Sequence, residues 1–302
     1  MKKYKVWLYA EDYLVDMTIA YLRYWIKTEK IKVLGIATNK ARCFRKWNEF
    51  ECFSLDDVKE SEYDYIIACD FRYDSVRMKE LLSEGFERDK IIAGKALESP
   101  FFDFEKWEKV HQCDISIISQ HCWGGVTYSD LQLPFKSPTI NLFFAMDDFF
   151  KFVDNLEEYL VMPLEYKEMH KDLNYPIAKL GDIILYFNHH RGRSFEDARN
   201  EWDKRRKRVN LDNILVQAPL YNDEQVEKFK KITYRKIGFY MKDTNCKDII
   251  TLDEFNDPYV NELYRGRFYD CVMDTSYQNK SKRFPRKYDP YKLLLGEDDF
   301  LV

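Results

Sequence analysis

The residue types best suited to chemistry in this sequence are a cysteine, Cys122, and a histidine, His189. A thiolate is a strong nucleophile, and a neighbouring imidazole or backbone dipoles can lower the pKa of a thiol enough to populate it. A histidine titrates near neutral pH, so His189 is suited to general acid–base work. His121 stands beside Cys122, but adjacent side chains seldom face each other. The structural alternative is that Cys122 and Trp123 simply pack under a glycine turn.

Cys122 belongs to the stretch from Ile117 to Phe144, which begins at the end of a predicted strand. Ligands bind outside the carboxyl ends of strands in open α/β sheets, so a site is expected here. Gly124 and Gly125 are expected to bend the chain and to leave backbone N–H groups free for an anion or oxyanion. Further residues of this stretch are expected to bind substrate, namely Ser119, Trp123, Ser137, Thr139 and Asn141.

His189 and His190 follow the apolar run Asp182 to Phe187, which is predicted to be a buried strand. We expect His189 to lie at the carboxyl end of a parallel strand, where the following loop opens into a cleft. Two adjacent histidines can also bind a metal, but no carboxylate or cysteine stands at a characteristic ligand spacing, so no metal site is predicted. The alternative is a solvated pair of histidines in a loop.

A helix is predicted to begin at Ser194, with Asp197 completing a capping box, and to run to Arg208. Arg205 and Arg206 follow the buried stripe of this helix and are expected at its inner edge. Arginine binds phosphate through two parallel hydrogen bonds, so we expect these two residues and Arg208 to bind a phosphorylated sugar or a nucleotide-sugar. Charge runs are often solvated helix faces instead.

The elements around these residues predict an α/β fold. In the first half, strands are expected at 5–10, 31–37, 51–54, 65–69 and 90–93, with helices at 13–28, 55–60 and 74–84 between them. In the second half, strands are expected at 114–119, 182–187, 213–217 and 236–240, with helices at 143–159, 194–208 and 223–231. This alternation predicts two consecutive three-layer α/β/α units with mainly parallel sheets. We therefore predict a Rossmann-like domain over 1–110 and a second domain, with the site, over 111–302.

The first unit lacks the sequence signal of a dinucleotide site. Its first strand-to-helix turn contains no glycine, which would be needed for close approach to a pyrophosphate, and it contains the carboxylates of Glu11 and Asp12. We predict no cofactor, and NAD(P) binding is not expected. The unit is interpreted as a recognition or scaffolding domain.

Composition narrows the classes of protein further. The 302 residues include 48 Lys and Arg against 52 Asp and Glu, a formal charge of −4, which argues against a general nucleic-acid binder. The longest apolar stretch, 140–153, is shorter than the roughly 20 residues of a membrane helix. Seven cysteines without a CxxC pair, and no export signal, indicate reduced thiols in the cytoplasm. The basic stretch 280–291 is expected to be ordered only by docking.

Three segments between about 115 and 216 carry a family resemblance: IISQHCWGGVTYSDLQLPFKSPTINLFF, YPIAKLGDIILYFNHH and SFEDARNEWDKRRKRVN. They resemble a bacterial family of unknown function that carries the label exopolysaccharide biosynthesis. Two positions depart from its pattern: His190 stands where the family usually has Tyr, and Gln120-His121 replace a commoner Asn-containing pair. The resemblance implies a role in surface-polysaccharide assembly but attaches no reaction to any residue.

Two hypotheses follow from the sequence. The first is a glycosyl- or acyltransferase of surface-glycan biosynthesis with His189 as base or acid, in which Cys122 is an acyl-accepting nucleophile in one version. The second is a non-catalytic protein that binds a glycan precursor or a biosynthetic partner, which the abundant aromatic residues fit equally well. The oligomeric state is left open.

Overall fold

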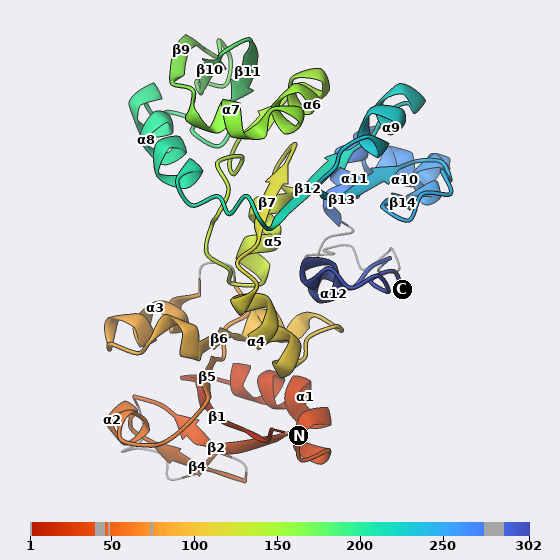
Figure 1. Ribbon diagram of the computed structural model, residues 1–302. Helices are drawn as coiled ribbons and strands as arrows, with labels where there is room; N and C mark the ends of the chain where they lie inside the picture. The colour runs from red at the N-terminus through yellow and green to blue at the C-terminus, as the bar shows by residue number, and fades with distance from the viewer. Residues whose placement is uncertain (1, 40–45, 48, 73–74, 275–286) are drawn as a thin grey trace. The chain divides into compact units, whose positions relative to one another are not determined.

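The computed structural model describes residues 2–39, 46–47, 49–72, 75–274 and 287–302. The chain is a mixed α/β protein that divides into two compact units (Figure 1). The first comprises the described residues up to Trp107 together with Asp130–Gln132, and the second comprises Glu108–Ser129 and Leu133–Val302. Most of the basic stretch expected to order by docking, 280–291, lies outside the described residues.

The first unit is built on a six-stranded sheet in the order β3-β4-β2-β1-β5-β6. Its strands are β1 (Tyr4–Tyr9), β2 (Ile31–Ala37), β3 (Lys46–Trp47), β4 (Phe50–Phe53), β5 (Tyr65–Ala68) and β6 (Ile91–Ala93). All neighbouring strands are parallel except β3 and β4. The α-helices are α1 (Leu14–Lys27), α2 (Leu55–Lys59) and α3 (Val76–Ser83), with 3-10 turns η1 (Arg88–Lys90) and η2 (Gly94–Glu98). Helix α4 (Phe104–Gln112) contains the division between the units.

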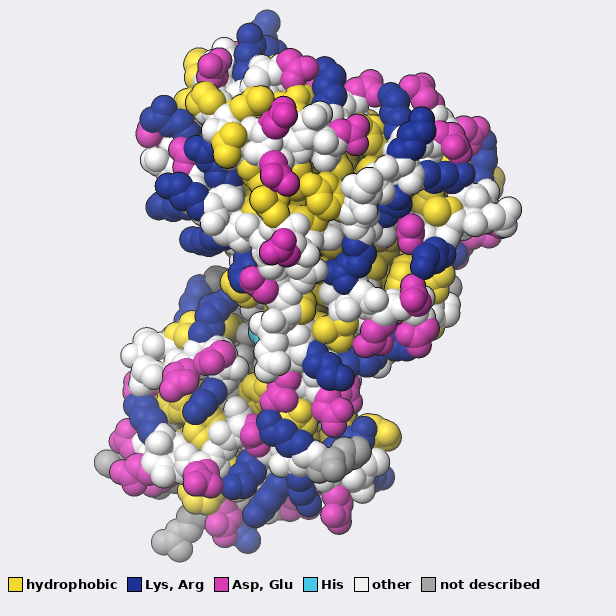
Figure 2. Space-filling model, in the orientation of Figure 1, with side chains coloured by type: hydrophobic (Ala, Val, Ile, Leu, Met, Phe, Trp, Pro, Cys, Tyr) yellow, Lys and Arg dark blue, Asp and Glu magenta, His cyan; other side chains and the backbone are white. Residues whose placement is uncertain are grey.

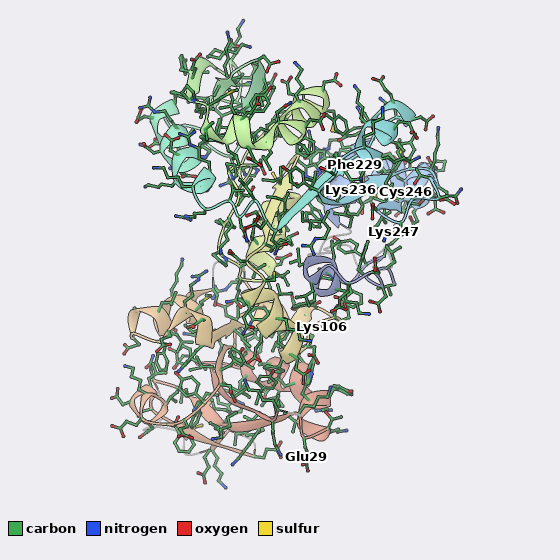
Figure 3. The ribbon with its side chains drawn as sticks, in the orientation of Figure 1. Glu29, Lys106, Phe229, Lys236, Cys246 and Lys247 are labelled. Carbon is green, nitrogen blue, oxygen red and sulfur yellow. The ribbon has the colours of Figure 1, made fainter. Side chains whose placement is uncertain are left out.

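The second unit contains a parallel four-stranded sheet in the order β14-β13-β12-β7. Its strands are β7 (Ser116–Ser119), β12 (Ile214–Pro219), β13 (Arg235–Tyr240) and β14 (Ile249–Thr251). The helices that connect or flank them are α5 (Trp123–Asp130), α9 (Asp223–Lys230), η3 (Asp253–Asn256), α10 (Pro258–Leu263), α11 (Phe268–Asp274) and α12 (Pro290–Leu295). Helix α9 approaches β13 closely at Gly238, where a Cβ atom would lie 2.9 Å from the ring of Phe229. Figure 3 labels Phe229 with Lys236, whose Nζ lies 5.9 Å from the centroid of that ring.

A second, antiparallel sheet in this unit was not expected. It has the order β8-β11-β10-β9, with β8 (Phe143–Phe144), β9 (Leu164–Met169), β10 (Pro176–Leu180) and β11 (Ile183–Tyr186). The run 182–187 is therefore not a parallel strand as predicted. A tight turn at Gly181, whose φ is +61°, folds β11 back onto β10. Helices α6 (Met146–Asp154), α7 (Leu156–Val161) and α8 (Phe195–Arg206) accompany this sheet (Figure 1).

The predicted single helix over 143–159 was also wrong. Its first residues form β8, and the remainder is divided into α6 and α7 at Asn155, whose φ of −128° and ψ of 41° are not helical. Asp148, in the first turn of α6, accepts the N–H of Ile184 at 3.0 Å and so ties the helix to β11. Helix α8 begins as predicted, because Ser194 and Asp197 form a reciprocal capping box.

The two sheets of the second unit share one hydrophobic core. Ile118 of β7 and Val216 of β12 belong to the same buried cluster as Ala178 of β10 and Leu185 of β11. Gln120, just beyond β7, adds a polar link, because its side-chain amide donates to the carbonyl of Phe144 at 2.5 Å. The ends of β7 and β8 are therefore held together inside one packed body.

The surface carries mixed charges. Figure 2 shows Lys and Arg side chains interspersed with Asp and Glu over the face drawn, in keeping with the small net charge of −4. Across the described residues, no helix combines the length and the apolar character that crossing a membrane would require.

Candidate functional site

The structure brings Cys122 and His189 together, although 66 residues separate them in the sequence. The Sγ atom of Cys122 lies 2.9 Å from the Nε2 atom of His189. Cys122 is half-buried and His189 is exposed, so the contact lies at the surface of the second unit. A thiol in direct contact with an imidazole has the arrangement needed for nucleophilic catalysis, in which the imidazole takes the thiol proton.

Cys122 stands between a strand and a helix, at the carboxyl end of β7 and immediately before α5. The carbonyl of Cys122 accepts the N–H of Val126 at 2.9 Å, which makes Cys122 the N-terminal cap residue of α5. The expected glycine bend is replaced by this helix, since Gly124 and Gly125 lie in its first turn. A Cβ atom at Gly124 would lie 3.0 Å from Cβ of Ser119, so glycine here lets the helix pack closely on β7.

His189 is placed by a turn that follows β11, an antiparallel strand, and not by the parallel strand that was expected. The N–H of His190 donates to the carbonyl of Phe187 at 2.8 Å, and the N–H of Arg193 donates to the carbonyl of His190 at 3.0 Å. The ring of His190 is buried, with Nε2 3.5 Å from a carboxylate oxygen of Glu201. The turn is thus held by these backbone hydrogen bonds and by the buried ring of His190, while the exposed His189 contacts Cys122.

Burial shifts both members of the pair toward their neutral forms. Burial raises the pKa of the Cys122 thiol to about 11, although its own backbone N–H lowers it in part. Burial, and then the charge of Arg191, lowers the pKa of His189 below 6.5. At neutral pH the resting pair is therefore a thiol and a neutral imidazole, and His189 is available as a base.

Two aromatic side chains, His121 and Tyr269, lie near Cys122, and a third, Tyr221, lies near Tyr269. The ring of Tyr269, on α11, lies 5.8 Å from the ring of His121, and a charge on Cys122 would raise the pKa of Tyr269, so the tyrosine lies near both. Tyr221, which follows β12, has a pKa raised to about 12 by burial and then by the nearby Tyr269. Both tyrosines keep exposed surface, 38% for Tyr269 and 41% for Tyr221. Tyr269 near the thiol, with Tyr221 beside it, thus offers partly exposed aromatic surface to a ligand.

Several residues predicted to bind substrate are buried and hydrogen-bonded to other groups of the protein. The hydroxyl of Ser119 donates to Gln217 at 2.6 Å, and the N–H of Ser119 donates to the hydroxyl of Thr139 at 3.2 Å. Ser137 and Thr139 share a hydrogen bond of 3.0 Å, and all of these side chains are buried. The indole of Trp123 is fully buried and donates to the hydroxyl of Tyr288 at 3.2 Å. This network holds the segment in place.

The arginines predicted to bind phosphate have partners within the protein. Arg205 donates to the carbonyl of Ile140 at 3.0 Å and lies 2.7 Å from a carboxylate oxygen of Glu201. Arg206 donates from one nitrogen to the carbonyls of Leu160 and Met162, both at 2.8 Å.

The guanidinium groups of Arg205 and Arg206 thus join α8 to the loop at Ile140 and to the end of α7. Arg208 is exposed beyond the end of α8, and Asn141 has left-handed backbone geometry with φ of +66°. No group of three or more potential metal ligands occurs in the part of the chain that the structure describes.

Comparison with known proteins identifies the family. A family model described as "Domain of unknown function (DUF1919)" matches residues 93–281. The chain belongs to this family. An uncharacterized protein of Haemophilus influenzae is 34% identical over 102 residues, which cover 34% of this chain and 48% of that protein. This chain thus spans about half the length of the curated relative it matches. The DUF1919 match includes both Cys122 and His189.

Sequence reasoning did not identify Tyr269 as a neighbour of Cys122, nor Tyr221 as a neighbour of Tyr269. His121 was noted only as the residue next to Cys122 in the sequence; its Nδ1 accepts the N–H of Trp123, and its ring lies 5.8 Å from that of Tyr269. The position of Tyr221 directly beyond β12, at the same sheet edge as Cys122, was the available signal for one of them. Tyr269 lies on a helix distant in sequence, and no local pattern marks it.

Proposed function

We propose that this DUF1919 protein is an acyltransferase that works through a thioester on Cys122, with His189 as general base. The observation that carries the proposal is the 2.9 Å contact between Sγ of Cys122 and Nε2 of His189. Because burial keeps the resting thiol protonated, activation must come from proton transfer to His189 during attack. The position at the N-terminus of α5 favours the negative charge that develops on sulfur.

The reaction proceeds in two balanced steps. Sγ of Cys122 attacks the carbonyl carbon of an acyl ester or thioester, its proton passes to Nε2 of His189, and a tetrahedral oxyanion forms. The bond to the leaving group then breaks, the proton passes from His189 to the leaving oxygen or sulfur, and a thioester remains. An acceptor hydroxyl then gives its proton to His189 and attacks the thioester, which returns the acyl group to oxygen and the proton to Cys122.

The acceptor we propose is a sugar hydroxyl of a surface-polysaccharide precursor, such as a phosphorylated sugar or a nucleotide-sugar. The exposed rings of Tyr221 and Tyr269 support this choice, because a flat aromatic face packs well against the C–H face of a sugar ring. The resemblance of the 115–216 segments to exopolysaccharide proteins also supports it. Since Arg205 and Arg206 have internal partners, the proposal does not depend on them for phosphate binding.

We further infer that the first unit is a three-layer, Rossmann-like α/β/α module that serves in recognition and not in catalysis, whereas the second unit combines its parallel sheet with an antiparallel one. The strand order β4-β2-β1-β5-β6, all parallel, supports the Rossmann-like assignment. Glu11 supports the non-cofactor role, because its carboxylate accepts the N–H of Asn39 at 2.5 Å in the place where a phosphate would approach.

The test of the acyltransferase proposal is covalent acetylation by p-nitrophenyl acetate. The wild-type protein should release a burst of p-nitrophenolate and gain one acetyl group at Cys122 by intact-mass and peptide analysis. Cys122→Ser should lose the thioester, whereas Cys246→Ser, which removes another half-buried thiol, should behave as wild type. A nucleotide-sugar that accelerates deacetylation and becomes acetylated would identify the acceptor. Absence of any adduct at Cys122 would contradict the proposal and favour a binding protein.

A further inference from the structure

His121 carries a buried nitrogen without a hydrogen-bond partner. The side chain is 6% exposed, and its Nε2 atom has no partner among the described residues. Its other ring nitrogen, Nδ1, accepts the backbone N–H of Trp123 at 3.1 Å. An unpaired buried donor costs about 1 to 3 kcal/mol, so such groups are rare and call for an explanation.

The location of the proton on His121 follows from this geometry. Burial lowers the pKa of His121 to about 3, so the ring is neutral at physiological pH and carries one N–H. Nδ1 must be the unprotonated nitrogen because it accepts a hydrogen bond. Nε2 is therefore a fixed hydrogen-bond donor, one residue away from the Cys122 nucleophile.

The hydrogen bond to His121 also occupies the backbone N–H of Trp123, the group that would ordinarily bind an oxyanion formed at Cys122. Where a nucleophile lies between a strand and a helix, the N–H of the next residue commonly donates to the oxyanion. That residue is Trp123 here, and its N–H is already bonded to His121. The unpartnered donor near the thiol is thus the imidazole N–H and not the amide.

Resting on the acyltransferase function, we propose that the Nε2–H of His121 is the donor that binds the oxyanion formed when Cys122 attacks an acyl carbonyl. Tyr269 marks the path of approach, because its ring lies 5.8 Å from that of His121 and near Cys122, and keeps 38% of its surface exposed. Movement of this ring on substrate binding gives the carbonyl oxygen access to Nε2. The orphan donor is then satisfied only in the reacting complex, where it lowers the barrier.

Two variants with amide side chains test the roles of Nδ1 and Nε2 of His121 separately. In His121→Asn, the side-chain oxygen still reaches the N–H of Trp123 as Nδ1 does, but the distal donor is lost. In His121→Gln, the longer side chain restores an N–H near the position of Nε2. Each variant and the wild type are treated with p-nitrophenyl acetate, which forms an oxyanion, and with iodoacetamide, which alkylates sulfur by direct displacement without one.

The quantity to compare is the ratio of the acetylation rate to the alkylation rate at Cys122, which is insensitive to a partial loss of folded protein. H121N should lower this ratio about 100-fold, as expected for loss of one oxyanion donor, and H121Q should recover most of the loss. An unchanged ratio in H121N would overturn the inference, whether both rates hold or both fall. Failure of the wild type to acetylate Cys122, with alkylation intact, would instead overturn the acyltransferase proposal on which it rests.

Discussion

The ends of the two parallel sheets differ in how their polar groups are satisfied. In the first unit, Glu11 accepts hydrogen bonds from the hydroxyl of Thr38 and the N–H of Asn39, and Asp70 accepts two from the guanidinium of Arg72. In the second unit, Nε2 of His121 has no hydrogen-bond partner among the described residues, and the thiol of Cys122 lies against the exposed imidazole of His189. At the first sheet end these carboxylates are hydrogen-bonded within the protein, whereas at the second the His121 N–H and the Cys122–His189 pair are left for a ligand.

The pKa shifts differ between the two sheet ends in the same way. Burial alone would raise the pKa of Asp70, but hydrogen bonds and the charge of Arg72 lower it to about 2, so the carboxylate is stabilised in its charged form. For Cys122 and His189, burial is the largest cause and favours the neutral forms. A paired charge contributes to stability, whereas a neutral nucleophile and base in contact are poised to exchange a proton with a substrate. We therefore expect substitutions at the first end to change stability and those at the second to change reactivity.

The largest effect should come from removing the base. His189→Ala should slow acetylation of Cys122 by p-nitrophenyl acetate by about 10² to 10⁴-fold, because the thiol then has no proton acceptor. His170→Ala is the matched control, since His170 is a half-buried imidazole of the second unit whose Nδ1 accepts backbone N–H groups of its own loop. Equal loss in both variants would contradict the role of His189.

The pH dependence sharpens this prediction. His189 acts as a base only when neutral, and its pKa lies below 6.5, so the wild-type acetylation rate should be level near neutrality and fall as the pH drops through that lowered pKa. In H189A this fall should disappear, and the rate should rise with pH toward the thiol pKa of about 11. Rapid alkylation of wild-type Cys122 below pH 6 would show a preformed thiolate and contradict this mechanism.

A smaller effect is expected from disturbing the close packing of α5 on β7, which positions the Cys122 thiol. Gly124→Ala should destabilise the protein by about 1 to 3 kcal/mol and lower Cys122 reactivity, because the new methyl group would lie 3.0 Å from Ser119 and 3.1 Å from Ile117. Gly125→Ala is the control, with one contact of 3.3 Å to Ile140. Thermal unfolding and the acetylation assay measure the two effects. Equal behaviour of the two variants would show that close packing at 124 does not position the nucleophile.

The smallest effect is expected at the sheet end of the first unit. Glu11→Ala should lower the free energy of unfolding by about 1 kcal/mol, because a half-buried carboxylate that accepts two hydrogen bonds is removed. Acetylation of Cys122 should remain unchanged. Chemical denaturation with the same assay tests both statements, and a clear loss of reactivity would mean that the two ends are not as separate in function as their hydrogen bonding indicates.

Sequence patterns predicted most strands of the two parallel arrangements but missed β8, β9 and β10 of the antiparallel sheet. The apolar runs of β5 and β12 and the capping box at Ser194 were predicted correctly. Strand β9 was missed because four of its six residues are exposed, which resembles a loop. Missing it concealed the antiparallel sheet, and so β11 was expected to be parallel.

The proximity of Cys122 and His189 was inferred from residue type and strand ends, but the strand before His189 was wrongly expected to be parallel. The histidine follows a strand of the antiparallel sheet, and the shared core and the hydrogen bonds of Gln120 to Phe144 hold that sheet beside β7. The tautomer of His121 was beyond sequence reasoning altogether, because it depends on a single hydrogen bond to Trp123. Long-range contacts and proton positions of this kind require coordinates.

The half-buried, protonated state of the Cys122 thiol also bears on its sensitivity to oxidants. Peroxides attack thiolates, and oxidation to sulfenic acid follows thiolate character and exposure. A thiol whose pKa is about 11 holds almost none of the vulnerable form at neutral pH, so Cys122 should survive oxidants that inactivate enzymes with a standing thiolate. Because His189 removes the thiol proton only during attack on the substrate, the sulfur stays a thiol, and so stays reduced, between turnovers.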